Sequence, residues 1–120
     1  MLIRSYKDLI VWQKGHLLIL DIYRVTQNFP KEELYGLTSQ IRRAVISVTS
    51  NIVEGFVRHS KKEKIQFYFI ALGSATEVES QLLIAKDLKF MKVEIYYELS
   101  SKVIEIVKML NKLIKSISNS

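Results

Sequence analysis

Apolar residues recur every three or four positions along most of the chain, a spacing that places side chains on one face of an α-helix. Four segments show this pattern, at about residues 6–28, 37–57, 60–88 and 93–117. Turn residues are scarce between and within them, with a single proline, Pro30, and four glycines. Because sandwiches and barrels need many turn residues, the pattern predicts four long helices.

Signals for helix ends separate these segments. Ser5 with Asp8, and Ser60 with Glu63, have the three-residue spacing of a capping box. Pro30 ends the first helix, since the residue before a proline is pushed out of helical geometry. Long helices with short connections predict an all-α fold, an antiparallel up-down-up-down four-helix bundle that forms one domain over residues 1–120.

The third segment is apolar nearly all round, whereas an ordinary surface helix carries a single apolar stripe. Such a helix has more than one apolar neighbour, so it is either central in the bundle or lies at a subunit contact. This is the first indication of an oligomer. The apolar residues of the segment are Ile65, Phe67, Tyr68, Phe69, Ile70, Leu72, Val78, Leu82, Leu83 and Ile84.

Glu79 falls on one of the apolar files of this third segment. A carboxylate at such a position needs a partner, because an unpaired buried charge is severely unfavourable. Arg42 and Arg43 on the second segment are the natural candidates. We therefore predict an ion pair between the second and third helices.

The chain is basic, with 18 Lys and Arg against 12 Asp and Glu and a formal net charge of +6. A basic balance favours a polyanionic partner such as RNA or DNA. Basic side chains gather at the turn between the second and third helices, as Arg58, His59, Lys61, Lys62 and Lys64. This run is either a solvated turn or an edge that contacts phosphate groups, and both interpretations remain open.

Residues for catalysis or metal binding do not occur at recognisable spacings. The chain has no cysteine, no Glu-x-x-His motif of di-iron bundles and no glycine-rich phosphate loop. Neither His16 nor His59 has a nucleophile and an orienting acid nearby in sequence, and we interpret His16 as a partly buried, hydrogen-bonded residue. We expect no catalytic site, no metal and no cofactor.

The cellular compartment is predicted from two sequence signals, a signal peptide and a membrane-spanning segment. The apolar runs at the start of the chain are short and broken by Lys7, Asp8 and Lys14, unlike a signal peptide. No stretch approaches the roughly 18 uncharged apolar residues that span a bilayer. The expectation is a cytoplasmic protein without a membrane partner.

Several segments resemble a known family. DLIVWQK, FPKEELYGLTSQIRRA, SNIVEG, SKKEKIQFYFIALGSATEVESQL and MLNKLIKSI, in this order, are similar to the four-helix-bundle proteins encoded by intervening sequences of bacterial 23S ribosomal RNA genes, also called the S23 ribosomal protein family. The resemblance implies a bundle that assembles into a pentameric ring, without enzymatic activity. It also implies similarity in fold to accessory proteins of diversity-generating retroelements, which associate with nucleic acid.

The same resemblance assigns structural or oligomer-forming roles to a set of positions. The sequence departs from the family pattern at Thr49, where proline is common, and at Gly15 and Val53, where alanine is common. Val57 and His59 replace a usual glycine and arginine, which weakens the basic edge. The positions carried over are Trp12, Tyr35, Gly36, Gln40, Arg42, Arg43, Ser50, Asn51, Glu54, Gly55 and Glu79.

Two functions follow as hypotheses. The first is a non-enzymatic homo-oligomeric bundle, a pentamer by resemblance, that binds RNA or another nucleic acid. Its contacts are with phosphate, since no aromatic platform interleaves with the basic run. The second is a protein-interaction scaffold that uses its apolar helices. The residues predicted to contact nucleic acid are Arg43, Arg58, Lys61, Lys62 and Lys64.

Overall fold

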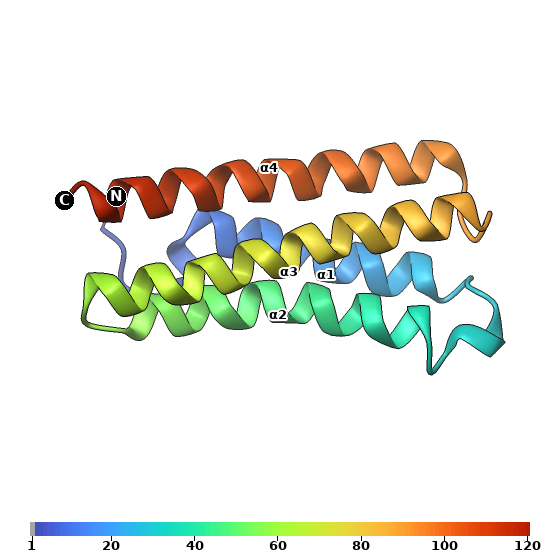
Figure 1. The fold of residues 1–120 in the computed structure, drawn as a ribbon, viewed down its shortest axis with the longest axis horizontal. Coiled ribbons are helices and arrows are strands. Elements are labelled where there is room, and N and C mark those ends of the chain that lie inside the picture. The colour runs from blue at the N-terminus through green and yellow to red at the C-terminus, as the bar shows by residue number, and fades with distance from the viewer. Residues whose placement is uncertain (1) are drawn as a thin grey trace.

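The structure is a computed structural model that describes residues 2–120, and its regular elements are all helical. Two short 3₁₀ helices, η1 (Tyr6–Asp8) and η2 (Lys31–Glu33), accompany four α-helices. The four are α1 (Ile10–Thr26), α2 (Leu37–Val57), α3 (Lys61–Asp87) and α4 (Val93–Ser118). The predicted all-α four-helix bundle is confirmed (Figure 1).

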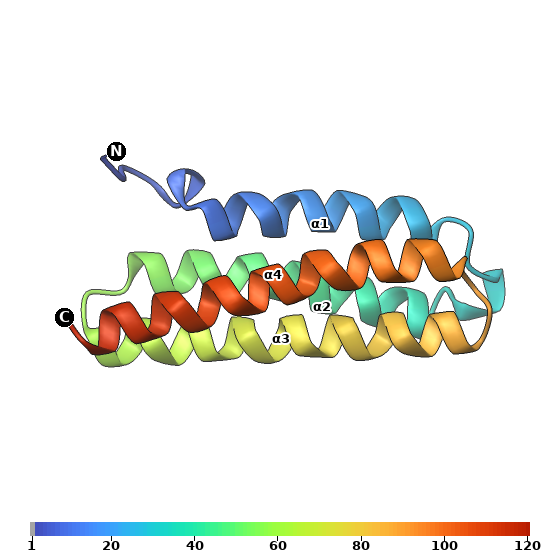
Figure 2. The same cartoon turned by 90° about the horizontal axis from the view of Figure 1, so that it is seen from above.

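The helices form an elongated bundle of 45 × 25 × 21 Å in which successive helices run in opposite directions (Figures 1 and 2). Each helix packs against two neighbours, and α1 lies diagonally across from α3, with no Cα atom of one within 8 Å of a Cα atom of the other. The chain start, the turn between α2 and α3 and the end of α4 lie together at one end (Figure 1). The two other connections lie at the opposite end.

The first helix is shorter than predicted at both ends. Asp8 accepts hydrogen bonds from the backbone N–H groups of Arg4 (2.8 Å) and Ser5 (3.1 Å), so the predicted capping box forms. It closes the single turn of η1, however, because Leu9 is extended and α1 begins only at Ile10. At the other end, Thr26 donates its hydroxyl to the Ile22 carbonyl (2.7 Å), and the chain leaves the helix there.

The other helix bounds agree with the sequence within a residue. At the start of α3, Ser60 accepts a hydrogen bond from the Glu63 N–H (3.1 Å), while the Glu63 carboxylate accepts from the Ser60 hydroxyl instead of completing the box. α3 ends with Lys89 in the left-handed region (φ 64°). The Phe90 N–H then donates to the Ala85 carbonyl (2.9 Å), which closes the helix end in the manner usually provided by glycine.

The core is continuous along the bundle and takes buried residues from all four α-helices, among them Leu18, Ile41, Leu82 and Leu110. Helix α2 approaches its neighbours closely. A Cβ atom added at Gly55 would lie 2.6 Å from Cε1 of Tyr68, far inside contact distance. Among the described residues, no helix is long and apolar enough to cross a membrane.

Candidate nucleic-acid interface

Positive charge is concentrated at the end of the bundle that contains the α2–α3 turn. We call this the basic end, and define it as residues 2–18, 47–74 and 106–120, the halves of the helices nearest that turn. It holds ten Lys or Arg and three Asp or Glu, whereas the remaining described residues hold eight and nine. The ten are Arg4, Lys7, Lys14, Arg58, Lys61, Lys62, Lys64, Lys108, Lys112 and Lys115.

Two of the predicted nucleic-acid residues hold the α2–α3 turn together. Arg58 forms an ion pair with Glu54 (3.1 Å), and its guanidinium lies 4.7 Å over the ring of Phe67. The ammonium of Lys64 donates to the carbonyls of Gly55 (3.1 Å) and Phe56 (2.8 Å) at the end of α2. A cation there offsets the negative end of the helix dipole. Both side chains therefore have a structural role in the turn.

Lys61 and Lys62 differ from these two residues. They are exposed in the first turn of α3, and neither forms an ion pair within the described part of the chain. Positive side chains are unfavourable at the positive end of a helix dipole, which instead favours anions. Folding gives no reason for this placement, whereas an anionic ligand would benefit from both the lysines and the helix end.

Arg43 is not brought together with the other four predicted residues. It lies in the half of α2 away from the basic end, 15 residues before Arg58, which corresponds to about 22 Å along the helix. There it lines a cavity of about 350 Å³ between α2 and α3, with Gln40, Ser47, Glu77 and Gln81. Sequence analysis grouped Arg43 with the other four residues and did not take account of the separation between them along the bundle axis.

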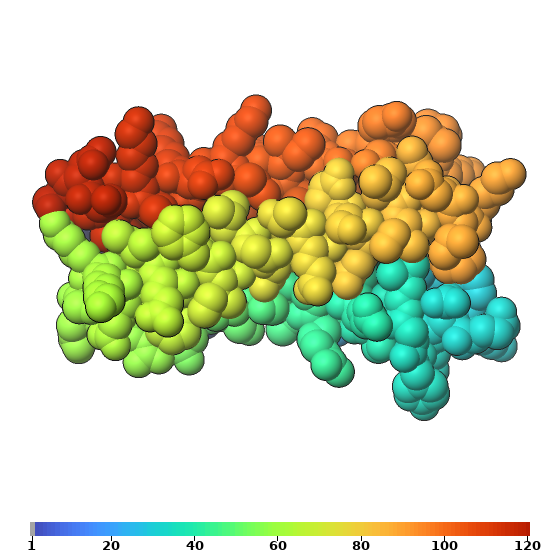
Figure 3. Space-filling view, viewed as in Figure 1, coloured from blue at the N-terminus to red at the C-terminus, as the bar shows by residue number. Residues whose placement is uncertain are grey.

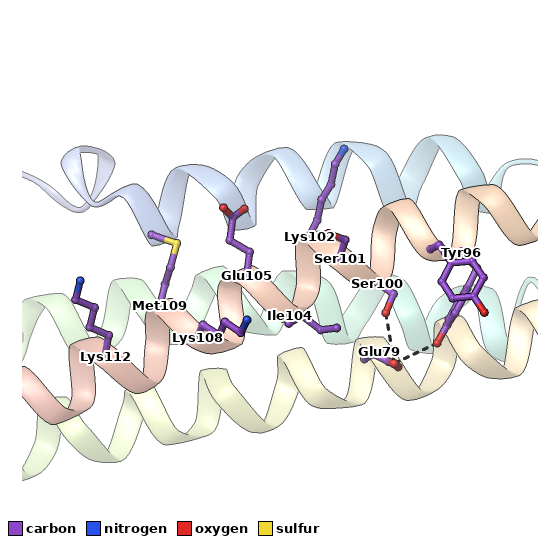
Figure 4. A pocket seen from close by; sticks show the side chains of 11 residues that line it. Glu79, Tyr96, Ser100, Ser101, Lys102, Ile104, Glu105, Lys108, Met109 and Lys112 are labelled. Carbon is purple, nitrogen blue, oxygen red and sulfur yellow. Dashed lines mark hydrogen bonds between the residues drawn. The ribbon is translucent and has the colours of Figure 1, made fainter.

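The predicted ion pair of Glu79 with Arg42 or Arg43 is wrong. Glu79 faces α4, where its Oε1 accepts from the hydroxyls of Tyr96 (3.2 Å) and Ser100 (3.5 Å) (Figure 4). Arg42 faces α1, where its Nε donates to Thr26 Oγ1 (2.9 Å). Glu79 and Arg42 therefore point away from the α2–α3 contact. The prediction considered only α2 and α3, although α3 also packs against α4.

Glu79 opens onto a groove of about 820 Å³ along α4 (Figure 4). The carboxylate and its two hydroxyl partners lie at one end of the groove, and Lys108, Met109 and Lys112 line the other end (Figure 4). Sequence analysis missed Tyr96 and Ser100 as partners of Glu79. The lining residues are Glu79, Tyr96, Tyr97, Ser100, Ser101, Lys102, Ile104, Glu105, Lys108, Met109 and Lys112.

Histidines and acids do not gather into a metal site within residues 2–120, where no group of three or more is placed to hold an ion. His16 was predicted to be partly buried and hydrogen-bonded, and this is wrong. Its side chain is exposed and stacks on Trp12, with ring centroids 5.0 Å apart. His16 directly follows Gly15, which is buried on the core-facing side of α1, and the rotation from one helical residue to the next directs His16 away from the core.

Comparison with known proteins identifies the family. Residues 7–112 match the family of 23S rRNA-intervening sequence proteins. The chain belongs to this family. A solved structure of a protein of unknown function from the S23 ribosomal protein family of Bacteroides thetaiotaomicron has a TM-score of 0.83 and 27% identity, covering 91% of this chain and 98% of that one. No curated protein matches the sequence. The resemblance stated from the sequence motifs is confirmed.

The positions that the 23S rRNA-intervening sequence family suggested as structural divide into two groups. Some have contacts inside the chain: Trp12 packs on His16, and Asn51 donates to the Ser47 carbonyl (2.8 Å). Others do not. Tyr35, beside Gly36, is 92% exposed, and the Gln40 side chain makes no hydrogen bond among the described residues. The fold of one chain explains the first group only.

Proposed function

We propose that this 23S rRNA-intervening sequence protein is a cytoplasmic, non-enzymatic protein that assembles into a homo-oligomeric ring and binds RNA through its basic end. The observation that carries the proposal is the separation of charge along the bundle. The basic end contains ten basic and three acidic side chains, while the opposite half contains nearly equal numbers of the two. A uniformly basic surface would suit general solubility, whereas a polarised one suits a polyanion at one place.

The contact proposed at the basic end is electrostatic and directed at phosphates. Lys61 and Lys62 supply exposed ammonium groups at the N-terminus of α3. Each neutralised phosphate releases condensed counterions, which is the main source of sequence-independent affinity for nucleic acid. Repetition of the basic end around a ring multiplies these weak contacts.

Assembly into a ring is supported by apolar surface on two diagonally opposite helices. Ile10, Leu17 and Leu20 are exposed on α1. Helix α3, which crosses the near face in Figure 3, exposes Phe69, Ile70, Leu83 and Ile84. A closed ring needs two different surfaces that meet head to tail, and α1 and α3 provide such a pair. The number five comes from the family resemblance alone.

Gly73 adds a second argument for a contact on α3. A Cβ atom added there meets nothing within 4 Å, so packing inside the chain does not require glycine. Glycine within a helix is unfavourable by roughly 1 kcal/mol relative to alanine. A neighbouring chain that approaches the α3 backbone closely accounts for it.

The test combines mass and salt dependence. We expect light scattering to give a ring-sized species that takes up a structured RNA at 50 mM salt and releases it as salt rises. Each lost phosphate contact should lower the slope of log affinity against log salt by about one. The double substitution Lys61→Glu, Lys62→Glu should weaken uptake strongly. The matched control, Lys31→Glu with Lys89→Glu, makes the same charge change at the other end and should have little effect.

A monomeric mass would contradict the ring, and equal losses in the two double variants would contradict the role of the basic end. The exposed apolar helix faces favour a second function, that of a protein-interaction scaffold. A ring that ignores RNA at every salt concentration supports that function instead. Its apolar contact with a partner protein should persist or strengthen as salt rises.

A further inference from the structure

Three aromatic side chains lie together at the basic end. The rings of Tyr6 and Trp12 meet edge to face, with centroids 5.0 Å apart and planes at 72°. The imidazole of His16 stacks on the indole of Trp12, also with centroids 5.0 Å apart and with planes at 18°. We call Tyr6, Trp12 and His16 the aromatic stack. Its members come from η1 and α1, so they do not interleave in sequence with the basic run at the α2–α3 turn.

The aromatic stack is held in place by local structure. The capping box closes the turn of η1 that carries Tyr6. The Gln13 side chain donates to the Lys7 carbonyl (2.8 Å), which attaches η1 to α1. Trp12 is partly buried and packs against the core. A binding surface whose rings are already fixed loses little conformational entropy when a ligand arrives.

His16 is the accessible end of the aromatic stack. Its neighbour Gly15 faces α2, where an added Cβ atom would lie 2.8 Å from Cγ2 of Thr49, so α1 lies closely against α2. The next residue along the helix points away from the core, and the side chain of His16 is exposed. Trp12 covers one side of the imidazole, and a further flat ring can continue the stack on its exposed part.

The aromatic stack lies within the excess of positive charge that defines the basic end. Arg4 and Lys7 flank Tyr6 in sequence, and both are exposed. η1 contacts α2, the helix that leads into the turn with Lys61 and Lys62. Positive charge alone attracts any polyanion, whereas positive charge beside stacked rings suits a polyanion that also carries flat rings. Single-stranded nucleic acid has both features.

We infer that the aromatic stack binds an unpaired base of single-stranded RNA, which stacks on the His16 ring while its flanking phosphates lie at the basic side chains. The inference rests on the proposed RNA binding and adds a base contact to it. A base inside a duplex already has a neighbour on each face, so the bases that fit are those in loops and at ends. Because every base has a π-face, the contact selects single strands without selecting a particular base.

One strand can reach the aromatic stack and the α2–α3 turn together. Gly15 lies opposite Thr49, and α2 ends eight residues later at Val57, which corresponds to about 12 Å along the bundle. A stacked strand rises about 3.4 Å per nucleotide, so roughly four nucleotides join His16 to the turn. Phosphates at the lysines of the turn then supply the salt-dependent affinity, and the stacked base adds the preference for single strands.

The experiment compares two labelled oligomers of equal length by fluorescence anisotropy at one salt concentration. One is oligouridine, and the other is an abasic strand with the same phosphates and no bases. We expect oligouridine to bind about tenfold more tightly, because a base that stacks on an aromatic side chain strengthens single-strand binding by about that factor. Trp12 is the only tryptophan of the chain, and its emission should change with oligouridine and stay unchanged with the abasic strand.

Matched substitutions locate the base contact, because the only two histidines of the chain are both exposed and both lie at the basic end. His16→Leu keeps a side chain over Trp12 and removes the stacking ring. The two oligomers should then bind equally, with unchanged affinity for the abasic strand. His59→Leu removes an imidazole at the α2–α3 turn and should retain the preference for oligouridine. His16→Phe restores a ring and should retain it too.

The outcomes separate the base contact from the proposed RNA binding. Equal, salt-sensitive binding of the two oligomers by the unmodified protein would overturn the base contact and leave the proposed function standing. Absence of binding to either oligomer would overturn both. A preference that persists in His16→Leu, or disappears in His59→Leu, would place the contact elsewhere and overturn the inference. A parallel loss of affinity for both oligomers in His16→Leu would give His16 a structural role and overturn it as well.

Discussion

The α2–α3 seam and the α1–α4 seam are held by different means. Along α2–α3, Gly55 lets the Tyr68 ring reach the α2 backbone, and Ser47 bonds to Ser74 across the helices (2.8 Å). Along α1–α4, two ion pairs cross the surface: Lys102 with Asp21 (2.8 Å) and Lys14 with Glu105 (3.2 Å). Cavities do not distinguish the seams, since one of about 350 Å³ opens along α2–α3 and two of about 360 and 130 Å³ open along α1–α4.

The α2–α3 seam therefore depends on close packing of side chains, whereas the α1–α4 seam depends in part on charge. A seam packed around a glycine tolerates almost no added volume, because interiors are close-packed and neighbours relax only in part. A seam bridged by exposed ion pairs responds instead to salt and pH, and each bridge stabilises it little. We therefore expect mutations along α2–α3 to have large effects and charge changes along α1–α4 to have small ones.

Gly55→Ala should give the largest effect. The added methyl group would lie 2.6 Å from Tyr68 Cε1, and the whole ring, itself buried, would have to move. Overpacking of this kind lowers the free energy of unfolding by about 1–3 kcal/mol. Urea unfolding measures it. An unchanged midpoint would show that the two helices can separate without loss and would contradict the close-packed view of this seam.

Gly73→Ala is the matched change on the same pair of helices, at a position where the added methyl group meets nothing within 4 Å. In dilute, monomeric protein it should raise the free energy of unfolding by about 0.5–1 kcal/mol through helix propensity. In the proposed ring the same methyl group should weaken assembly, which light scattering at a series of concentrations detects. Stabilisation without any effect on assembly would argue against a contact at this position.

Lys102→Met should have a smaller effect, because its side chain is 44% exposed. We expect a loss of at most about 0.5–1 kcal/mol, reduced further at high salt. The hydrogen bond to Asp21 raises the pKa of Lys102. This contribution is complete below the ordinary lysine pKa and is lost as pH rises through the raised value. A double-mutant cycle with Asp21→Asn isolates the pair, and a coupling independent of salt would contradict its surface character.

The pKa of Asp8 gives the subtlest prediction. Hydrogen bonds from the backbone N–H groups of Arg4 and Ser5 lower it below the ordinary aspartate value. The stabilisation of η1 should therefore be present above that ordinary value and disappear as pH falls through the lowered one. An NMR titration of the Asp8 carboxyl carbon measures the shift. A midpoint at or above the ordinary value would mean that the capping box does not persist in solution.

The sequence predicted the helices well and their mutual contacts poorly. Periodicity placed α2 within a residue at both ends, because that signal is local to the helix. Ser5 and Asp8 were recognised as a capping box, yet it caps a single 3₁₀ turn and not α1. Glu79 was given a partner on α2 although it faces α4, since a helix with two neighbours offers more than one solution to the same burial problem.

The candidate interface was predicted in part for the same reason. Lys61 and Lys62 were found because they lie together in the sequence, and their exposure agrees with a ligand-binding role. The contribution of Lys108, Lys112 and Lys115 to the basic end was not recognised, although the predicted antiparallel arrangement already brings the end of α4 beside the α2–α3 turn (Figure 1). The unpaired Oε1 of Gln81 could not be predicted, since satisfaction of a polar atom depends on its neighbours in space.

By itself, then, the sequence determined the number of helices, their approximate bounds and the family, because these depend on spacing and on short motifs. Only the tertiary structure decided which residues meet across helices. It separated Arg43 from Arg58 by about 22 Å along α2, paired Glu79 with Tyr96 at 3.2 Å and left the Oε1 atom of Gln81 unpaired. A helix fixes the direction of each side chain about its own axis, whereas the partner in that direction is set by the packing of the whole bundle.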